Sequence, residues 1–362
     1  MGSGQDTKIE IEMNRILKVG IAGYGVVGKR RAQCVNNNPN LELVAICDQT
    51  FDKSGRTEDG INFFDNYRSL INEQIDVLIV CLTNDVAADA TILGLQKGLH
   101  VFCEKPPGRD LNDIHSVIEV EKENLGLKLM YGFNHRFHDS VQEAIKIISS
   151  GNFGKIINLR GVYGKSKLIT FNQPVWRTKR EIAGGGVLLD QGIHMVDLMR
   201  LMAGEFIEVH SFVSNSHWGY DVEDNAYALM KTNDGIVGML HSSATQWRHR
   251  FNLEINLQKG SLVLGGILSG SKSYGSETLT IINANPDEDN GDPVQEVRTY
   301  NKDPSWDSEI ELFVNCILDE KEVSSSSSYD AFQTMKLVNK IYYNDRRWSI
   351  EYDIQDPEKI DI

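Results

Sequence analysis

The chain has 362 residues, of which 41% are hydrophobic and 24% are charged. This length can bury a substantial core and predicts two domains, because domains typically hold about 100–200 residues. The formal net charge of −14 argues against binding to nucleic acid or to an anionic membrane surface. Small anionic substrates stay compatible with this charge, because a local group of lysines and arginines can form a positive pocket.

The cysteines are odd in number, widely spaced and mostly in apolar runs; they are Cys34, Cys47, Cys81, Cys103 and Cys316. This pattern predicts buried free thiols in a reducing compartment, with no disulfide framework and no metal site. No apolar run approaches the roughly 18 residues of a membrane span, and the start lacks the order of a signal peptide. A cytoplasmic location is therefore expected. Residues 1–12 precede a second methionine, and we expect them to be an added or ragged start outside the fold.

From residue 13 to 133, short apolar runs alternate with helical segments. Strands are expected at 17–22, 41–47, 77–82, 100–103 and 128–132, and helices at 26–34, 86–97 and 111–124. Asp110 is a candidate N-cap for the last of these helices. The run at 77–82 is apolar throughout, as in a strand that is covered on both faces. Repeated units of this kind predict an α/β domain with a doubly wound parallel sheet.

From about residue 155, longer strands follow with less helix between them, at 156–163, 226–231, 236–243 and 251–258. In the last of these, every second residue from Phe251 to Leu257 is apolar, which is typical of a half-exposed strand. The segment 284–304 is polar and predicts a loop, and the serine run 324–328 predicts a linker. Helices at 306–319 and 329–344 are expected to close the chain. Residues 134–362 are thus predicted to form an α+β domain with a large, mostly antiparallel open sheet, for substrate binding and oligomerisation.

The sequence GYGVVG at 23–28 is a GxGxxG pattern between an expected strand and an expected helix, and Asp48 follows at the end of the next strand. The first glycine permits a tight turn, the second admits a diphosphate, and the third allows close packing of helix on strand. The Asp48 carboxylate can bind ribose hydroxyls and repels a 2′-phosphate. The pattern predicts a Rossmann domain that binds NAD in preference to NADP. A glycine turn followed by a solvated aspartate is the alternative interpretation.

The stretch EKPP at 104–107 follows an expected strand, at the sheet edge where such folds bind ligands. A residue before proline favours extended backbone, so Lys105 is expected to be held stiffly. Its ammonium can donate to a substrate oxygen or, with a lowered pKa, exchange a proton. A surface lysine beside a proline turn is equally consistent with this motif alone.

A helix is expected over 189–202, entered through a flexible loop of glycines at 184–186 and closed by Gly204. Asp190 and His194 are four residues apart and would share a face of this helix. A carboxylate beside an imidazole can fix its tautomer and raise its basicity, as alcohol oxidation requires. By itself, such a pair is more often structural or exposed than catalytic.

Several motifs in this order resemble the Gfo/Idh/MocA family of NAD(P)-dependent sugar and polyol oxidoreductases: GYGVVG, AICD, EKPP, YGFNHRF at 131–137, WR at 176–177 and GGGVLLDQGIHMVDL. The resemblance covers nearly the whole chain from about residue 16. The stretches at 163–167 and 222–232 are similar to members in nucleotide-sugar and surface-glycan pathways. Many relatives place a histidine where this chain has Ala87, which puts in doubt any ligand contact at that position.

The resemblance implies a nicotinamide held between the two domains. Cofactor contacts are expected from Gly23, Tyr24, Gly25, Val26, Val27, Gly28, Asp48, Thr83, Asn84, Glu104, Lys105, Asn134, Trp176 and Arg177. Substrate contacts are expected from Lys105, Arg136, Tyr163, Asp190 and His194.

The favoured hypothesis is hydride transfer between NAD and a secondary hydroxyl carbon of a sugar, polyol or nucleotide sugar. In it, His194 is the general base in oxidation, Asp190 orients it or relays the proton, and Lys105 stabilises the developing carbonyl oxygen. One alternative is an NAD-dependent glycosidase that oxidises its sugar transiently, and another is a non-enzymatic sensor of a dinucleotide or sugar. The apolar face of the open sheet also predicts a homodimer or homotetramer.

Overall fold

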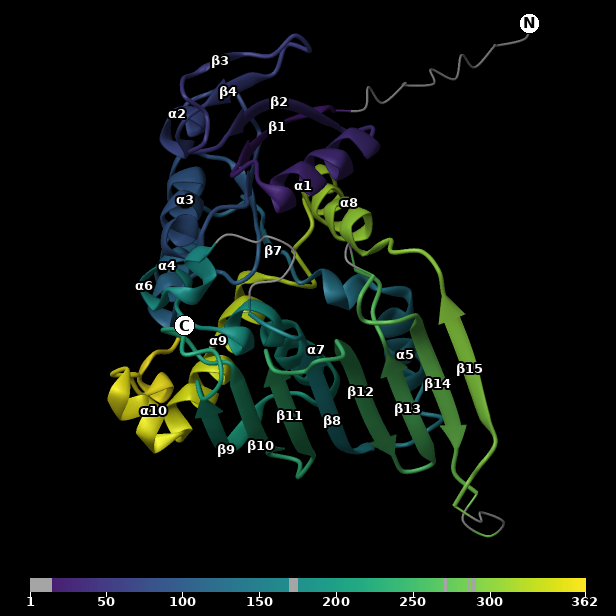
Figure 1. The fold of residues 1–362 in the computed structure, drawn as a ribbon. Helices are drawn as coiled ribbons and strands as arrows, with labels where there is room; N and C mark the ends of the chain where they lie inside the picture. Colours follow the sequence, from purple (N-terminus) through teal and green to yellow (C-terminus); the bar gives the residue numbers. More distant parts are fainter. Residues whose placement is uncertain (1–14, 169–174, 270–271, 286, 288–290) are drawn as a thin grey trace, which may run out of the picture.

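The computed structural model describes residues 15–168, 175–269, 272–285, 287 and 291–362, so the predicted start at 1–12 lies outside the described residues. A parallel sheet with its helices lies at one end of the molecule, and a large open sheet lies at the other (Figure 1). Among the helices described, none combines the length and the apolar character that crossing a membrane requires. All five cysteines are free, as predicted.

In the part of the chain that the structure describes, the parallel sheet has seven strands in the order β3-β4-β2-β1-β5-β6-β7. They are β1 Leu17–Ala22, β2 Leu41–Cys47, β3 Gly55–Arg56, β4 Asn62–Phe64, β5 Val77–Val80, β6 His100–Cys103 and β7 Leu129–Tyr131. Neighbouring strands are parallel, except that β3 and β4 pair in the antiparallel direction. The sequence did not predict these two strands. The doubly wound sheet is confirmed, and the carboxyl ends of β1, β5 and β6 lie side by side.

Helices cover both faces of this sheet; they are α1 Val26–Asn37, α2 Tyr67–Ile71, α3 Asn84–Gln96, α4 Leu111–Glu123 and α8 Ser305–Leu318. On one face, α1 and α8 pack against strand residues such as Val19 and Phe102. On the other face, α3 and α4 pack against residues such as Leu78 and Val101. Asp110 caps α4 as predicted, since its side chain accepts two backbone N–H groups. A helix from the last sixth of the chain therefore completes the cover of the first domain's sheet.

The open sheet has eight strands within the described residues, in the order β15-β14-β13-β12-β8-β11-β10-β9. They are β8 Ile156–Gly164, β9 Phe206–Ser214, β10 Asn225–Thr232, β11 Val237–Ser243, β12 Arg250–Leu257, β13 Gly260–Gly265, β14 Glu277–Asn283 and β15 Gln295–Tyr300. Neighbours are antiparallel except for β8 and β11, so the mostly antiparallel open sheet is confirmed. The loop predicted over 284–304 is wrong in part, because β15 is an edge strand whose largely exposed side chains lack the alternation of a half-buried strand.

One face of the open sheet is covered by α5 Asp139–Ser149, α7 Ile193–Ala203 and α9 Ser328–Asn344 (Figure 1). Short elements complete the structure: the single-turn helices η1 Asn134–Phe137, η2 Val175–Thr178 and η4 Pro357–Lys359, together with α6 Arg180–Ala183 and α10 Arg346–Glu351. The two last predicted helices are confirmed as α8 and α9, but α10 and η4 follow them. They were missed because each is too short to show helical periodicity.

The serine run at 324–328 is not a linker. Ser327 caps α9 in a reciprocal capping box with Asp330. The buried Ser326 accepts the backbone N–H of Tyr131 through its carbonyl at 2.8 Å, which joins the run to β7. The prediction is wrong because serine satisfies the free N–H groups of a helix start as readily as it solvates a linker.

Candidate active site

The turn between β1 and α1 leaves open space at the start of the helix. Gly23 has a φ of +92°, and a Cβ on Gly28 would lie 1.9 Å from the Gly23 carbonyl oxygen. Both positions therefore need glycine, one for its conformation and the other for close packing. A Cβ on Gly25 would meet no atom within 4 Å, and Gly25 caps α1 without any side-chain hydrogen bond. The exposed N–H groups and the space above them fit the diphosphate of a dinucleotide.

Asp48 lies beside this turn, directly after β2. Its Oδ2 accepts the Tyr24 backbone N–H at 2.9 Å, and its Oδ1 accepts the backbone N–H and the hydroxyl of Thr50. The carboxylate is thus held against the glycine turn at Tyr24 and is only half-buried. Ribose hydroxyls can add hydrogen bonds to it, whereas a 2′-phosphate would meet a like charge. The residues present therefore fit NAD.

Lys105 lies at the same edge of the parallel sheet, directly after β6. Its Nζ donates to the backbone carbonyl of Asp190 at 2.5 Å, which links the EKPP turn to the second half of the chain. Burial lowers the pKa of Lys105, although the charges of Asp190 and Glu104 act against this. The interpretation as a free surface lysine is therefore wrong. A half-buried lysine with a lowered pKa can donate a hydrogen bond and exchange a proton.

Asp190 lies in a π-helical turn, Leu188–Gly192, which precedes α7. Its Oδ2 accepts from Lys165 Nζ at 3.1 Å, and its Oδ1 accepts from Arg177 Nε at 3.3 Å. Burial alone would raise the pKa of this carboxyl, but the charges of Lys165, Lys105 and Arg177 lower it below its usual range. Asp190 is therefore an ionised carboxylate that gathers three cationic side chains.

His194 lies in the first turn of α7 and is only 5% exposed. Its ring stacks on that of His135, with centroids 3.7 Å apart and planes at 13°. Burial lowers the pKa of His194 well below its usual value, and the charges of Lys105 and His138 add to the effect. The imidazole is therefore neutral near pH 7 and can accept a proton.

The four-residue spacing predicted that the Asp190 carboxylate orients His194. This prediction is wrong. Its two oxygens face Lys165 and Arg177, and among the described residues His194 Nδ1 has no hydrogen-bond partner. The spacing argument assumes a regular α-helix, whereas the wider π-helical turn changes the angle between residues four apart. His194 is held by stacking on His135 instead.

His135 is a residue of this site that the sequence interpretation missed. Its Nε2 is 3.1 Å from the hydroxyl of Tyr163, and its Nδ1 is 3.1 Å from Asn134 Oδ1. Asn134 Nδ2 donates to Ser305, so its oxygen accepts the proton of Nδ1, and His135 Nε2 accepts from Tyr163. Asn134, an expected cofactor residue, thus fixes the tautomer of His135. The motif YGFNHRF indicated that this segment belongs to the site, but it did not show that His135 is one of the site residues.

The glycines at 184–186 are packed tightly, so the prediction of a flexible loop is wrong. A Cβ on Gly186 would lie 2.1 Å from the carbonyl oxygen of Glu223. The buried Glu223 carboxylate accepts the N–H groups of Gly186 and Leu188 at 2.7 and 2.9 Å, and the hydroxyl of Tyr342 at 2.8 Å. Gly186 is needed for its small size and Gly184 also for its φ of +77°, and Glu223 fixes the turn that carries Asp190.

Arg136 lies away from these groups. It is 2% exposed, and its guanidinium is bound by Asp197 at 2.6 Å and by Asp330 at 2.8 Å. These ion pairs join η1 to α7 and α9 in the core. We therefore correct the expectation of a substrate contact and assign Arg136 a structural role.

The remaining expected cofactor residues surround the edge of the parallel sheet. Thr83 is the N-cap of α3, and Asn84 donates to a backbone carbonyl of α6 at 2.8 Å. Glu104 accepts from the buried Arg31 at 2.7 Å. A contact between NAD and any of these side chains stays a prediction.

Lys165, Trp176 and Arg177 complete the surroundings of Asp190. The Arg177 guanidinium lies 4.5 Å from the centre of the Trp176 ring. Lys165 is buried and had not been predicted. Its position directly after strand β8, in the stretch YGKSK, could have indicated that Lys165 belongs to the site.

Two family models match the chain. A model described as the oxidoreductase family with an NAD-binding Rossmann fold matches residues 17–133, and the model of the Gfo/Idh/MocA C-terminal domain matches residues 141–263. D-glucoside 3-dehydrogenase from Escherichia coli (strain K12) is 29% identical over 250 residues, covering 63% of this chain and 70% of that protein. Levoglucosan dehydrogenase from Pseudarthrobacter phenanthrenivorans is 27% identical over 296 residues, covering 68% and 73%.

A solved structure of levoglucosan dehydrogenase in complex with NADH matches with a TM-score of 0.78 at 21% identity. The match covers 92% of this chain and 98% of that one. The two chains therefore share their fold over 92% of this chain.

Proposed function

This chain belongs to the Gfo/Idh/MocA family of NAD-dependent oxidoreductases, and from that premise we propose that it transfers a hydride between NAD and a secondary hydroxyl carbon of a sugar or polyol. The observation that carries the proposal is the convergence of Lys105, Asp190 and His194 beside the edge where the glycine turn opens. A half-buried lysine, an ionised aspartate and a neutral histidine are groups that alcohol oxidation can use.

His194 is the proposed proton acceptor in the oxidative direction. The substrate hydroxyl gives its proton to this neutral imidazole, while the hydrogen on the same carbon leaves with its electron pair. NAD, when bound, supplies the hydride acceptor. Lys105 donates a hydrogen bond to the oxygen that becomes the carbonyl.

Asp190 has a positioning role in this proposal. Its carboxylate holds Lys165 and Arg177, and its backbone carbonyl holds Lys105. The glycine turn at 23–28 is proposed to bind the diphosphate, and Asp48 the ribose. Tyr163 and Lys165 are proposed to face the substrate with His194.

The substrate class is supported by relatives that are named for oxidising a glucoside, levoglucosan and inositol. A nucleotide sugar is a second candidate, because Lys167 and Arg248 are exposed near the buried Lys165 and would attract a diphosphate. We also propose a cytoplasmic location, which the five free cysteines support.

The test is a screen of sugars, polyols, sugar acids and nucleotide sugars for NAD reduction, followed at 340 nm. With the substrate found, His194→Ala should lower kcat by about 10²–10⁴-fold, while calorimetry shows nearly unchanged NAD binding. His115→Ala, at a half-buried histidine on α4, is the control and should keep full activity. Near-normal turnover of His194→Ala would refute the base, and product formation without NADH accumulation would favour the transient-oxidation glycosidase.

A further inference from the structure

Four aromatic side chains gather at the edge of the open sheet that carries Lys165; we call His217, Trp218, Tyr220 and Trp247 the aromatic shelf. The Trp218 ring lies 4.8 Å from His217, 6.3 Å from Tyr220 and 6.4 Å from Trp247, measured between centroids. Trp247 is 67% exposed, although tryptophan is among the most hydrophobic side chains. A group of this kind at the surface marks a binding site more often than a lone exposed side chain does.

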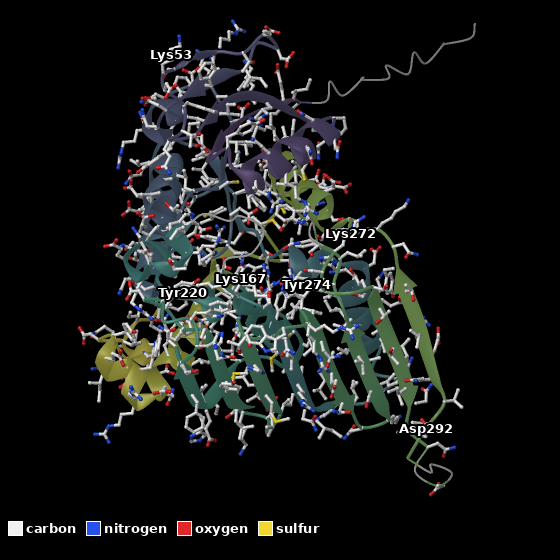
Figure 2. The ribbon with its side chains drawn as sticks, viewed as in Figure 1. Lys53, Lys167, Tyr220, Lys272, Tyr274 and Asp292 are labelled. Atoms are coloured by element: carbon white, nitrogen blue, oxygen red, sulfur yellow. The ribbon has the colours of Figure 1, made fainter. Side chains whose placement is uncertain are left out.

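The shelf is continuous with the site around Asp190. The Lys165 backbone donates to the carbonyl of Ser243 at 2.8 Å and accepts from the N–H of Gln246 at 2.9 Å. The Trp218 indole donates to the carbonyl of Ala244, between these two contacts, at 2.7 Å. The segment that precedes Trp247 and binds the Trp218 indole is therefore hydrogen-bonded directly to the Lys165 backbone. Figure 2 shows Tyr220 and Lys167 along the sheet edge that faces the parallel sheet.

The shelf is also held in place before any ligand arrives. Trp218 and Tyr220 pack on a small apolar cluster of Leu168, Val187, Val222 and Ala244. The backbone N–H groups of His217 and Trp218 donate to Asp224 Oδ2 at 2.8 and 3.1 Å. A preformed surface loses less conformational entropy on binding than a mobile one.

We propose that the aromatic shelf is an outer subsite that stacks a second ring joined to the reacting sugar. A pyranose packs the C–H groups of one face on an aromatic ring and keeps its hydroxyls in water, and a nucleobase stacks through its π-face. Either ring would extend outward from His194 past Lys165 to Trp247. This inference rests on the proposed function, because it places the reacting sugar at His194.

The test compares one-ring and two-ring substrates in the full-length protein. The one-ring probes are a monosaccharide that the wild type oxidises and its methyl glycoside; the two-ring probes are a disaccharide and a UDP-sugar with the same reacting sugar. Trp247→Ala should lower kcat/KM for a two-ring probe about 5- to 10-fold, mostly through KM, and leave one-ring probes unchanged. Trp247→Phe should keep most of the wild-type kcat/KM for the two-ring probes, because it keeps an aromatic ring.

Tyr329→Ala is the matched control, because Tyr329 is an exposed aromatic residue on α9 and is 54% exposed. It should leave both substrate classes unchanged. A selective loss with the disaccharide identifies a sugar as the second ring, and a selective loss with the UDP-sugar identifies a nucleobase.

Equal losses for one-ring and two-ring probes, or no loss for either, would overturn the subsite. A changed oligomeric state of Trp247→Ala without a selective loss would also overturn it, since a second copy of the chain would then cover the shelf. Calorimetry measures the affinity of the NADH-bound protein for the two-ring probes, and so tests the aromatic shelf separately from the proposed function. If the wild type oxidises no sugar, the proposed function fails; weaker binding of cellobiose or UDP-glucose by Trp247→Ala, with glucose binding unchanged, then still supports the shelf.

Discussion

Burial decides what single ionisable side chains do in this protein. His135 and His194 stack in the core, and burial lowers the pKa of each well below its usual value. Asp190 is half-buried, and three neighbouring cations keep it ionised. The site thus holds a stable carboxylate and a neutral base a few residues apart in the sequence.

The two histidines should make stability depend on pH. Their pKa values are lower folded than unfolded, so the unfolded chain binds more protons below about pH 6.5. The free energy of unfolding that they contribute is present above this pH and falls by up to about 1.4 kcal/mol per pH unit for each histidine as the pH decreases. Denaturant unfolding at pH 7.5, 6.5 and 5.5 measures it.

The variant His135→Gln should flatten this dependence, and His115→Gln on α4 should not. Burial raises the pKa of Glu223, which contributes the opposite slope, so the difference between variant and wild type is the decisive quantity. Equal slopes for wild type and His135→Gln would contradict the prediction.

Asp48 should determine which cofactor binds. Asp48→Ser removes the carboxylate that we propose to bind the ribose, which is also the partner of the Tyr24 N–H. We expect NAD to bind about 10-fold more weakly, since a hydrogen bond to a charged group contributes about 1.5–3 kcal/mol, while NADP binds more tightly than before. Calorimetry with both cofactors measures this, with the exposed Asp52→Ser as control. An unchanged ratio of the dissociation constants for NAD and NADP would count against the role of Asp48.

At the scale of elements, one buried arginine joins three segments. Arg31 of α1 donates to Glu104 of the EKPP turn at 2.7 Å and to Glu309 of α8 at 2.5 Å. Its guanidinium also lies over the rings of Phe102 and Trp306, at 4.6 and 4.2 Å from their centroids. Burial raises the pKa of Glu309 to about 8, although the charge of Arg31 acts against this.

Arg31→Met should therefore lower the free energy of unfolding by about 3–5 kcal/mol, because it leaves the carboxyls of Glu104 and Glu309 without their buried cationic partner. Adding Glu309→Leu should restore part of the loss. The neighbouring Arg30→Met is the control; Arg30 is partly exposed where it pairs with Asp303, and its loss should cost about 0–1 kcal/mol. Denaturant unfolding measures all three variants, and equal effects at Arg31 and Arg30 would show that the buried network is dispensable.

At the scale of the whole molecule, one face of the open sheet has no cover within the described residues. Cross-strand neighbours on this face are apolar and exposed, among them Phe212 beside Tyr227 and Leu229 beside Met239. Phe212 is 77% exposed. We propose that a second copy of the chain covers this face in a dimer or in a tetramer built from dimers.

Light scattering at micromolar concentration should show a dimer or tetramer for the wild type. Phe212→Glu combined with Leu229→Glu should give monomers, because two charges would be buried at the interface. Ile350→Glu, at an exposed position on α10, should leave the assembly intact. A monomeric wild type would refute the proposed assembly.

The sequence by itself determined the local elements of this protein. The strands Leu17–Ala22 and Leu41–Cys47, the glycine turn and the cap at Asp110 follow from apolar runs, turn chemistry and hydrogen bonds between near neighbours. The tertiary structure alone decided that Asp190 binds Lys165 and Arg177, that His135 stacks on His194, and that α8 covers the first sheet. The reason is physical: backbone patterns are set over a few residues, whereas the partner of a buried side chain depends on how distant segments pack.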